Sequence, residues 1–431
     1  MRRYSLFYFW IWVFIIFIPV SPLNAETGVL QEAGEFSFFQ WGMLQGFDPQ
    51  HNGWDVHLGG QLAVDANYYD SDNVKDRGLR WETVNVLFMG NYKNELFFHI
   101  EPDLLGIDTL DNLYEAWAGW HFDSALRVKA GQVKVALSTE FATREENLPA
   151  VDYGFSSYLD GRYDLGLQID GALGSNLFWY EATAVSGNGF DLAGNSRDAA
   201  QFSIRAVSFP LDRLRFEWLR NAFAGFSFAY SPDFDDELFL ATPLRSTTFA
   251  TANLDGDSAR WLHGEAGWFW GPLRVGAERV HGAVNDVKVS SGGRKDFDRL
   301  TSWSAYGAWF ITGQQVRWKQ GRWLPPVSKT AAGKNDQERD FLGFLDSLGC
   351  LELAFRYSNA DMDRDLFKEG LTDYGISSQE VRTATLNLNW YPRDGLVISA
   401  GWVKTIADQD LFSFGGTDRD SSFILRTILT F

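Results

Sequence analysis

The chain has 431 residues, of which 45% are hydrophobic and 22% charged, so it is neither collagen-like nor a low-complexity disordered sequence. Its formal net charge of −18 argues against general nucleic-acid binding, because a nucleic-acid surface requires a basic face for the phosphates. A single cysteine, Cys350, excludes an internal disulfide framework and a cysteine-cluster metal site. Aromatic residues make up 16% of the chain, an excess that the fold has to explain.

Residues 1–25 have the features of a secretory signal peptide. Arg2 and Arg3 precede an apolar run from Leu6 to Val20, and the small residue Ala25 follows. We expect cleavage after Ala25, and a signal anchor that stays in the membrane is the alternative. With either outcome the chain leaves the cytoplasm.

The remaining sequence alternates between apolar and polar residues. Beyond Ala25 no window approaches the roughly 18 consecutive apolar residues of a transmembrane helix, so a closed β-barrel is the remaining way to cross a bilayer. Alternation is clearest in four segments: Val56–Ala66, Asp164–Asp170, Leu351–Ser358 and Arg382–Tyr391. This period of two predicts strands with one face toward lipid and one toward a watery lumen.

Connections between these segments alternate in length. Short turns rich in Gly, Pro, Asn and Asp occur at Lys93-Asn94, Asp123-Ser124, Gly271-Pro272 and Arg393–Gly395. Long polar connectors occur at Val135–Tyr163, Pro232–Asp257, Gly282–Leu300 and Asn359–Ser378. Short turns on one side and long loops on the other are typical of an outer-membrane barrel. The stretch Gly313–Gly349 is long although it falls on the short-turn side, and its Pro325-Pro326 pair predicts a partly extended, exposed excursion.

The sequence therefore predicts an all-β protein, a transmembrane antiparallel β-barrel of about 16 strands over residues 54–431. Residues 26–53 form a short periplasmic segment in this interpretation. Trp and Tyr gather at headgroup level around such barrels, which accounts for the aromatic excess. A soluble β-sandwich is the alternative, but its core would hold more aliphatic and fewer aromatic side chains.

The C-terminal segment Ser421–Phe431 alternates and ends on an aromatic residue. It resembles the terminal strand that the bacterial β-barrel assembly machinery recognises. We therefore expect this machinery as a partner through Phe431, and the outer membrane of a Gram-negative bacterium as the location. Outer-membrane lipid and lipopolysaccharide are the expected surroundings, and no nucleic-acid partner is expected.

Several motifs resemble the phosphate-selective porin O and P family. The clearest is Leu126–Glu140 (LRVKAGQVKVALSTE), followed by Asn147-Leu148-Pro149 and by Gly161–Gly166 (GRYDLG). Further similar segments, in family order, are Ala305–Gly313 (AYGAWFITG), Gly349–Ser358 (GCLELAFRYS) and Leu386–Tyr391 (LNLNWY). Two positions depart from the family pattern: Ala136-Leu137 stands where Pro-Phe is common, and Tyr163 is inserted.

The resemblance implies a homotrimer of sixteen-stranded barrels, each with a water-filled pore for passive diffusion of small anions such as phosphate or polyphosphate. A loop folded inward after the fifth strand, here Val135–Tyr163, would narrow the pore. Pores select ions through the charges that line them. The basic candidates on the predicted lumen face or constriction loop are Arg127, Lys129, Lys134, Arg144, Arg162, Arg205, Arg274, Arg356 and Arg426.

The lining is mixed, because the same parity supplies acidic residues such as Glu101, Glu115 and Glu265. A general or sugar-permeable porin without anion selectivity is therefore the alternative. A barrel enzyme is a further alternative, although the sequence has no nucleophile elbow and no phosphate-cradling loop. The lumen-parity histidines come from distant strands, so neither a metal site nor a cofactor is expected.

Overall fold

The computed structural model describes residues 53–69, 78–106, 113–160, 162–174, 177–187, 200–326 and 349–431. The predicted signal peptide at 1–25 and all but the last residue of the predicted periplasmic segment at 26–53 lie outside the described residues. In the described ranges, no helix is both long enough and apolar enough to span a membrane.

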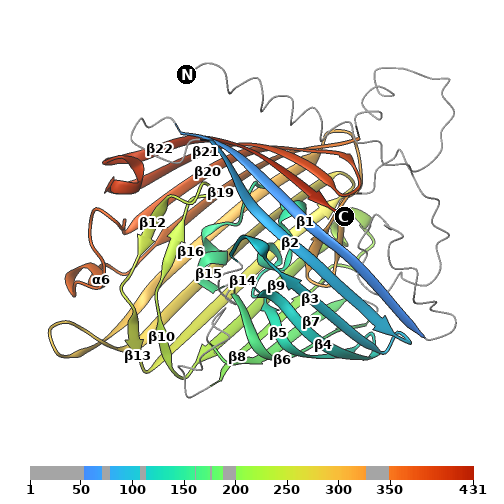
Figure 1. Ribbon diagram of the computed structural model, residues 1–431, viewed down its shortest axis with the longest axis horizontal. Helices are drawn as coiled ribbons and strands as arrows, with labels where there is room; N and C mark the ends of the chain where they lie inside the picture. The colour runs from blue at the N-terminus through green and yellow to red at the C-terminus, as the bar shows by residue number, and fades with distance from the viewer. Residues whose placement is uncertain are drawn as a thin grey trace.

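Sixteen antiparallel strands close into one barrel, in which each strand pairs with the next barrel strand along the chain and the last pairs with the first (Figure 1). The first eight are β1 Trp54–Tyr69, β2 Gly78–Tyr92, β3 Leu96–Pro102, β4 Leu113–Asp123, β5 Leu126–Val135, β6 Arg162–Leu173, β7 Phe178–Val185 and β8 Gln201–Ser208. The others are β9 Ala222–Ser231, β14 Ser258–Trp270, β15 Leu273–Lys288, β16 Arg294–Phe310, β19 Cys350–Asp361, β20 Glu380–Arg393, β21 Leu396–Leu411 and β22 Thr417–Thr430. The pairing of β1 with β22 closes the ring, which confirms the predicted barrel and its strand count.

Alternation along the strands separates an outer face from an inner one. On β20, Leu386 and Leu388 are 46% and 40% exposed, whereas the intervening Asn387 is 1% exposed. Apolar side chains thus face outward, where lipid would cover them, and polar side chains face the lumen. Outward-facing Trp270 and Trp402 are about half exposed, as predicted for aromatic residues at a membrane boundary.

Long loops fold back into the lumen instead of standing above it. The loop after β5 carries α3 (Thr139–Ala142), η4 (Glu145–Asn147) and α4 (Phe155–Asp160). The loop after β9 carries β10 (Phe234–Asp236), β11 (Phe239–Ala241), β12 (Thr247–Ala250) and β13 (Leu254–Gly256). Other short elements are η2 (Leu104–Gly106), η5 (Glu217–Leu219), α6 (Arg364–Lys368) and η7 (Phe412–Phe414).

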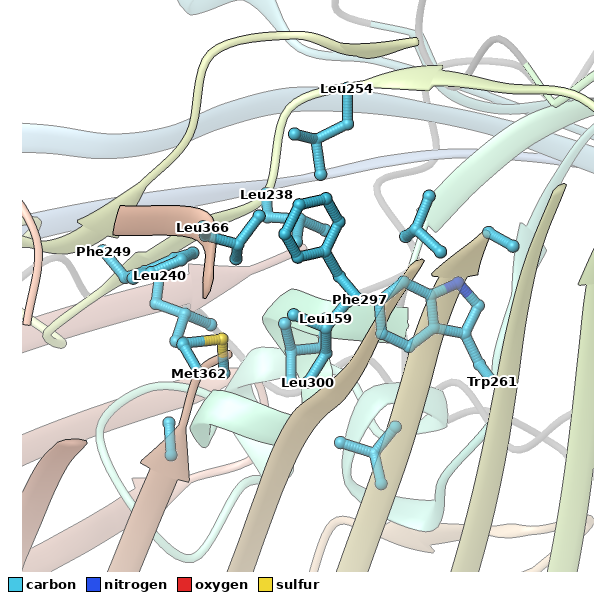
Figure 2. Packing of buried hydrophobic residues seen from close by; sticks show 14 of the residues in the cluster. Leu159, Leu238, Leu240, Phe249, Leu254, Trp261, Phe297, Leu300, Met362 and Leu366 are labelled. Atoms are coloured by element: carbon cyan, nitrogen blue, oxygen red, sulfur yellow. The ribbon is translucent and has the colours of Figure 1, made fainter. Parts of the chain in front are cut away.

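An apolar cluster binds these loops to the inner wall. Figure 2 shows Trp261 of β14 and Phe297 and Leu300 of β16 packed with Leu159 of α4. Loop residues complete the cluster: Leu238, Leu240, Phe249, Leu254, Met362 and Leu366. The inner face is therefore not polar throughout, because loop side chains exclude water from this part of the wall.

The described part of the excursion, Gly313–Pro326, folds inward. It forms a hairpin of β17 (Arg317–Lys319) and β18 (Arg322–Leu324), and Trp323 is only 1% exposed. The indole Nε1 of Trp323 donates a hydrogen bond to the Tyr306 hydroxyl at 2.8 Å. The prediction of an exposed excursion is wrong for this part, because the buried tryptophan attaches the hairpin to the wall.

The predicted connector Gly282–Leu300 is also corrected. Strand β15 continues to Lys288 and β16 begins at Arg294, so the connection is only five residues, 289–293. Pairs such as Val284 with Phe297 carry the hairpin beyond the ring, and both side chains are fully buried under the loops. Burial of these apolar side chains under the loops stabilises the extended ends of β15 and β16.

Candidate functional site: the constriction inside the barrel

Four arginines on the inner wall hold the loop after β5. Arg426 donates from Nε and Nη2 to Asp65 at 2.7 and 2.9 Å, and from Nη1 to the Val151 carbonyl at 2.9 Å. Arg274 donates to both carboxylate oxygens of Glu352 at 2.7 and 2.8 Å, and to the Asn147 carbonyl at 3.1 Å. Each guanidinium thus uses one edge for a carboxylate and one for the loop backbone.

The other two also bind a carboxylate and the loop, Arg356 through the loop backbone and Arg205 through a loop side chain. Arg356 donates to Glu140 Oε1 at 2.6 Å and to the Tyr153 carbonyl at 3.0 Å. Arg205 donates to Glu265 Oε1 at 3.0 Å and to the Thr139 hydroxyl at 2.9 Å. All four arginines are 1% or 2% exposed.

The irregular backbone of the loop explains why these donors are needed. Carbonyls outside regular secondary structure must find other partners when buried. The side-chain amides of Asn387 and Asn389 add further donors, to the carbonyls of Pro149 and Leu148. Locally, Ser138 caps α3 by accepting a hydrogen bond from the Phe141 amide at 3.1 Å.

Arg127 and Lys129 of β5 share one carboxylate. Arg127 Nε lies 2.6 Å from Asp170 Oδ1, and Lys129 Nζ lies 3.1 Å from Asp170 Oδ2. The Lys129 ammonium also lies over the Trp117 ring, 4.9 Å from its centroid. The two cations share this carboxylate, and Glu181, the register partner of Asp170 on β7, lies beside them.

Lys134, near the C-terminal end of β5, lies among aromatic rings. Its ammonium is 4.6 Å from the ring centroid of Phe141, 5.4 Å from that of Tyr163 and 5.7 Å from that of Tyr153. In the described ranges, no carboxylate oxygen lies within 4.0 Å of Lys134 Nζ. The aromatic faces stabilise the cation without neutralising it.

The remaining two predicted cations differ in position. Arg144, on the constriction loop, binds Glu101 at 3.2 Å and Glu146 at 3.0 Å. Arg162 begins β6, at the far end of that strand from Asp170, and donates to the Gln201 side chain at 2.9 Å. The structure therefore brings Arg144 to the wall beside β3, whereas Arg162 stays at the strand end.

Arg322 is a basic residue of the lumen that the sequence interpretation missed. It lies on the inward-folded hairpin, and among the described residues its side chain has no hydrogen bond or ion pair. Burial, and then the nearby Arg127, lower its pKa. Together with Arg144 it lines a cavity that extends toward the short β20–β21 turn.

A sequence signal for the hairpin existed. Residues 317–324 read RWKQGRWL, in which an Arg-Trp pair occurs on each side of Gln320-Gly321. Both central residues have positive φ, 51° and 78°, the conformation of the tight turns that favour glycine in hairpins.

Glu145 of the loop lies near Arg426 and also near other acidic groups. Burial raises its pKa from 4.5 to about 7, and Glu82 and Asp152 act in the same direction, while Arg426 opposes them. Glu145 is therefore partly protonated near neutral pH, which reduces the negative charge of the constriction.

Known proteins resemble this chain over nearly its full length. The profile of the family described as phosphate-selective porin O and P matches residues 56–409. Porin O of Pseudomonas aeruginosa is 22% identical over 423 residues, covering 91% of this chain and 88% of that protein. Identity at this level does not carry over a selectivity.

Solved structures share the fold. The outer membrane channel DcaP of Acinetobacter baumannii superposes with a TM-score of 0.51 at 14% identity, covering 88% of this chain and 98% of that one. OmpT of Vibrio cholerae, solved in a trimer form, superposes with a TM-score of 0.50 at 11% identity, covering 88% and 100%. The barrel has sixteen strands and an inward loop, and the family profile matches residues 56–409. The chain therefore belongs to the phosphate-selective porin O and P family and is an outer-membrane channel of a Gram-negative bacterium.

Proposed function

We propose that this channel lets small anions such as phosphate or polyphosphate diffuse passively, with a modest preference over cations, and that it has no enzymatic activity. The observation that carries the proposal is the presence in the lumen of two cations, Lys134 and Arg322, that have no carboxylate within 4.0 Å among the described residues. Arg127 and Lys129 add two further cations, which share Asp170.

Of the acidic groups of the same region, Glu101 is already paired and Glu145 is only partly charged, whereas Glu115 accepts a hydrogen bond from Trp117 Nε1. Glu101 accepts hydrogen bonds from Asn85 at 2.7 Å and Arg144 at 3.2 Å. Glu145 carries only part of a charge near neutral pH, because burial raises its pKa to about 7. A permeating ion within about a Debye length of these groups responds to the unbalanced cations, whereas charges on exposed loop tips are screened.

We assign a different role to Arg205, Arg274, Arg356 and Arg426. Each is buried and binds both a carboxylate and a residue of the loop after β5. In this proposal they position the constriction loop and do not contact the permeating ion.

The assembled state and partners belong to the same proposal. We expect a homotrimer, supported by the trimer form of the similar OmpT barrel. The outward apolar band would contact outer-membrane lipid and lipopolysaccharide, and the terminal strand ending at Phe431 would engage the assembly machinery.

The test is the reversal potential of purified channels in planar bilayers under a salt gradient. Wild type is expected on the anion side, and the double variant Lys129→Glu with Lys134→Glu should move toward the cation side. Arg322→Gln should move it in the same direction. Arg213→Gln removes the same charge from an exposed turn outside the lumen and is the matched control.

A cation-selective wild type that the Lys129/Lys134 variant leaves unchanged would reject the anion proposal and favour a general or sugar-permeable porin. Absence of conductance would instead favour a plugged or enzymatic barrel. If the Lys129/Lys134 variant shifts the reversal potential and Arg322→Gln does not, Arg322 does not contribute to the anion preference.

A further inference from the structure

Two glutamates face each other directly on neighbouring strands in the wall of the constriction. Glu101 on β3 and Glu115 on β4 are register partners. Like charges directly opposite each other destabilise a strand pair. Arg144 pairs with Glu101 at 3.2 Å, but in the described part of the chain no lysine or arginine lies within 4.0 Å of the Glu115 carboxylate. The wall therefore holds one carboxylate without a direct counter-ion.

His99 completes the group. Its Nε2 lies 3.0 Å from Glu101 Oε2, and its ring, 5% exposed, stacks on Trp117 at 5.5 Å with an interplanar angle of 12°. One ligand atom from each of His99, Glu101 and Glu115 lies within 4.8 Å of the other two. Sequence spacing did not reveal this group, because it pairs one histidine with two glutamates instead of joining several histidines.

The geometry suits a small transition-metal ion. Zinc binds imidazole nitrogen and carboxylate oxygen at about 2.0–2.2 Å in a tetrahedron, which places ligand atoms about 3.3 Å apart. The His99–Glu101 separation of 3.0 Å is close to that value. Glu115 offers a ligand atom within 4.8 Å of those of His99 and Glu101, so a side-chain adjustment would bring it to the same distance.

Neighbouring donors already orient both carboxylates. Asn85 and Arg144 donate to Oε1 of Glu101, which leaves Oε2 toward His99. The indole Nε1 of Trp117 donates to Glu115 Oε2 at 2.7 Å. In known metal sites, hydrogen bonds from neighbouring groups orient the side chains that bind the metal.

We propose that His99, Glu101 and Glu115 bind one divalent transition-metal ion of the zinc type in the pore wall. Binding releases to the solvent any proton held between His99 and Glu101, and the divalent ion adds positive charge to the wall of the lumen. The added charge shifts the reversal potential toward anions. The proposal holds whether or not the metal-free channel prefers anions.

Direct binding is the first test. Calorimetric titration of the purified full-length channel with zinc should show one ion per chain, and cobalt at the same site should give the visible absorption of a tetrahedral ion. His99→Gln and Glu115→Gln should each weaken zinc binding by about 100-fold or more, since even loss of a supporting hydrogen bond costs 10–100-fold. Glu115→Gln also removes a like-charge contact, so this variant should fold.

The matched control is His57→Gln. His57 forms another histidine–carboxylate pair on the barrel wall, with Asp55 at 3.0 Å, and its replacement should leave zinc binding unchanged. Equal zinc affinity in wild type, His99→Gln and Glu115→Gln would overturn the proposal, as would loss of binding in His57→Gln alone.

Bilayer recordings distinguish a failure of the metal-site proposal from a failure of the proposed anion preference. Zinc should shift the reversal potential of wild type but not of His99→Gln. If the metal-free wild type is cation-selective and zinc still shifts it, the anion proposal fails and the metal site stands. If zinc shifts neither protein, the metal site fails irrespective of the selectivity found without zinc.

Discussion

The backbone of Phe431 pairs with that of Gly60 on the first strand. The Gly60 amide donates to the Phe431 carbonyl at 2.9 Å, and the Phe431 amide donates to the Gly60 carbonyl at 3.0 Å. A side chain at Gly60 would meet the Phe431 ring, because a Cβ there would lie 2.9 Å from Cζ. The final residue of the sequence therefore takes part in closing the barrel.

Replacement of Phe431 by Asp should slow insertion and leave chains in the periplasm, since a charged side chain would replace the aromatic one against Gly60 and at the membrane boundary. The yield of heat-modifiable barrel in outer-membrane fractions measures this. Phe412→Asp, at a side chain that is 76% exposed, is the control and should insert normally. Equal yields from both variants would show that the terminal aromatic has no part in assembly.

Replacement of Arg356 by Met should loosen the constriction loop. It leaves Glu140 buried without its partner, a change that costs about 3–5 kcal/mol in comparable buried pairs. We expect earlier loss of the heat-modifiable form on warming and tryptic cleavage at Arg144. Adding Glu140→Leu should recover part of the loss, because the unpaired charge is removed.

Arg382→Met is the control for this effect. Arg382 pairs with Glu380 on the exposed outer surface, where such pairs contribute about 0–1 kcal/mol. If Arg356→Met is as stable and as protease-resistant as Arg382→Met, the buried arginines do not hold the loop.

Selectivity should depend on pH through Glu145. Its pKa of about 7 means that it gains a proton as pH falls from about 8 to about 6, and the constriction then loses negative charge. The ratio of anion to cation permeability should therefore rise as pH falls. Glu145→Gln should show the low-pH selectivity throughout and a flatter profile. A pH response in Glu145→Gln as large as in wild type would assign the effect to another group.

Cysteine labelling should confirm the sidedness of the barrel. In a Cys350→Ser background, which removes the buried native thiol, an impermeant reagent applied to intact cells should label Ser291→Cys but not Asn94→Cys. Ser291 lies in the exposed β15–β16 connection, and Asn94 in a short turn between β2 and β3. The reverse labelling pattern would invert the assigned topology.

Local sequence patterns predicted the barrel because the controlling rule is local. Side chains alternate strictly along a strand, and lipid and water are uniform solvents on the two faces, so each strand shows its orientation without reference to distant residues. Leu386 and Asn387 therefore point outward and inward as expected. The short turns followed the same local chemistry.

The roles of the inner charges were decided by tertiary structure. Arg356 and Lys134 were both predicted to line the pore, yet Arg356 binds Glu140, 216 positions away, whereas Lys134 lies over the rings of Phe141, Tyr153 and Tyr163. The inward turn of the hairpin holding Arg322 likewise depends on Trp323 meeting Tyr306. A loop becomes part of the lumen only when distant wall residues supply donors and apolar surface for it, and such long-range partners leave no periodic trace in the sequence.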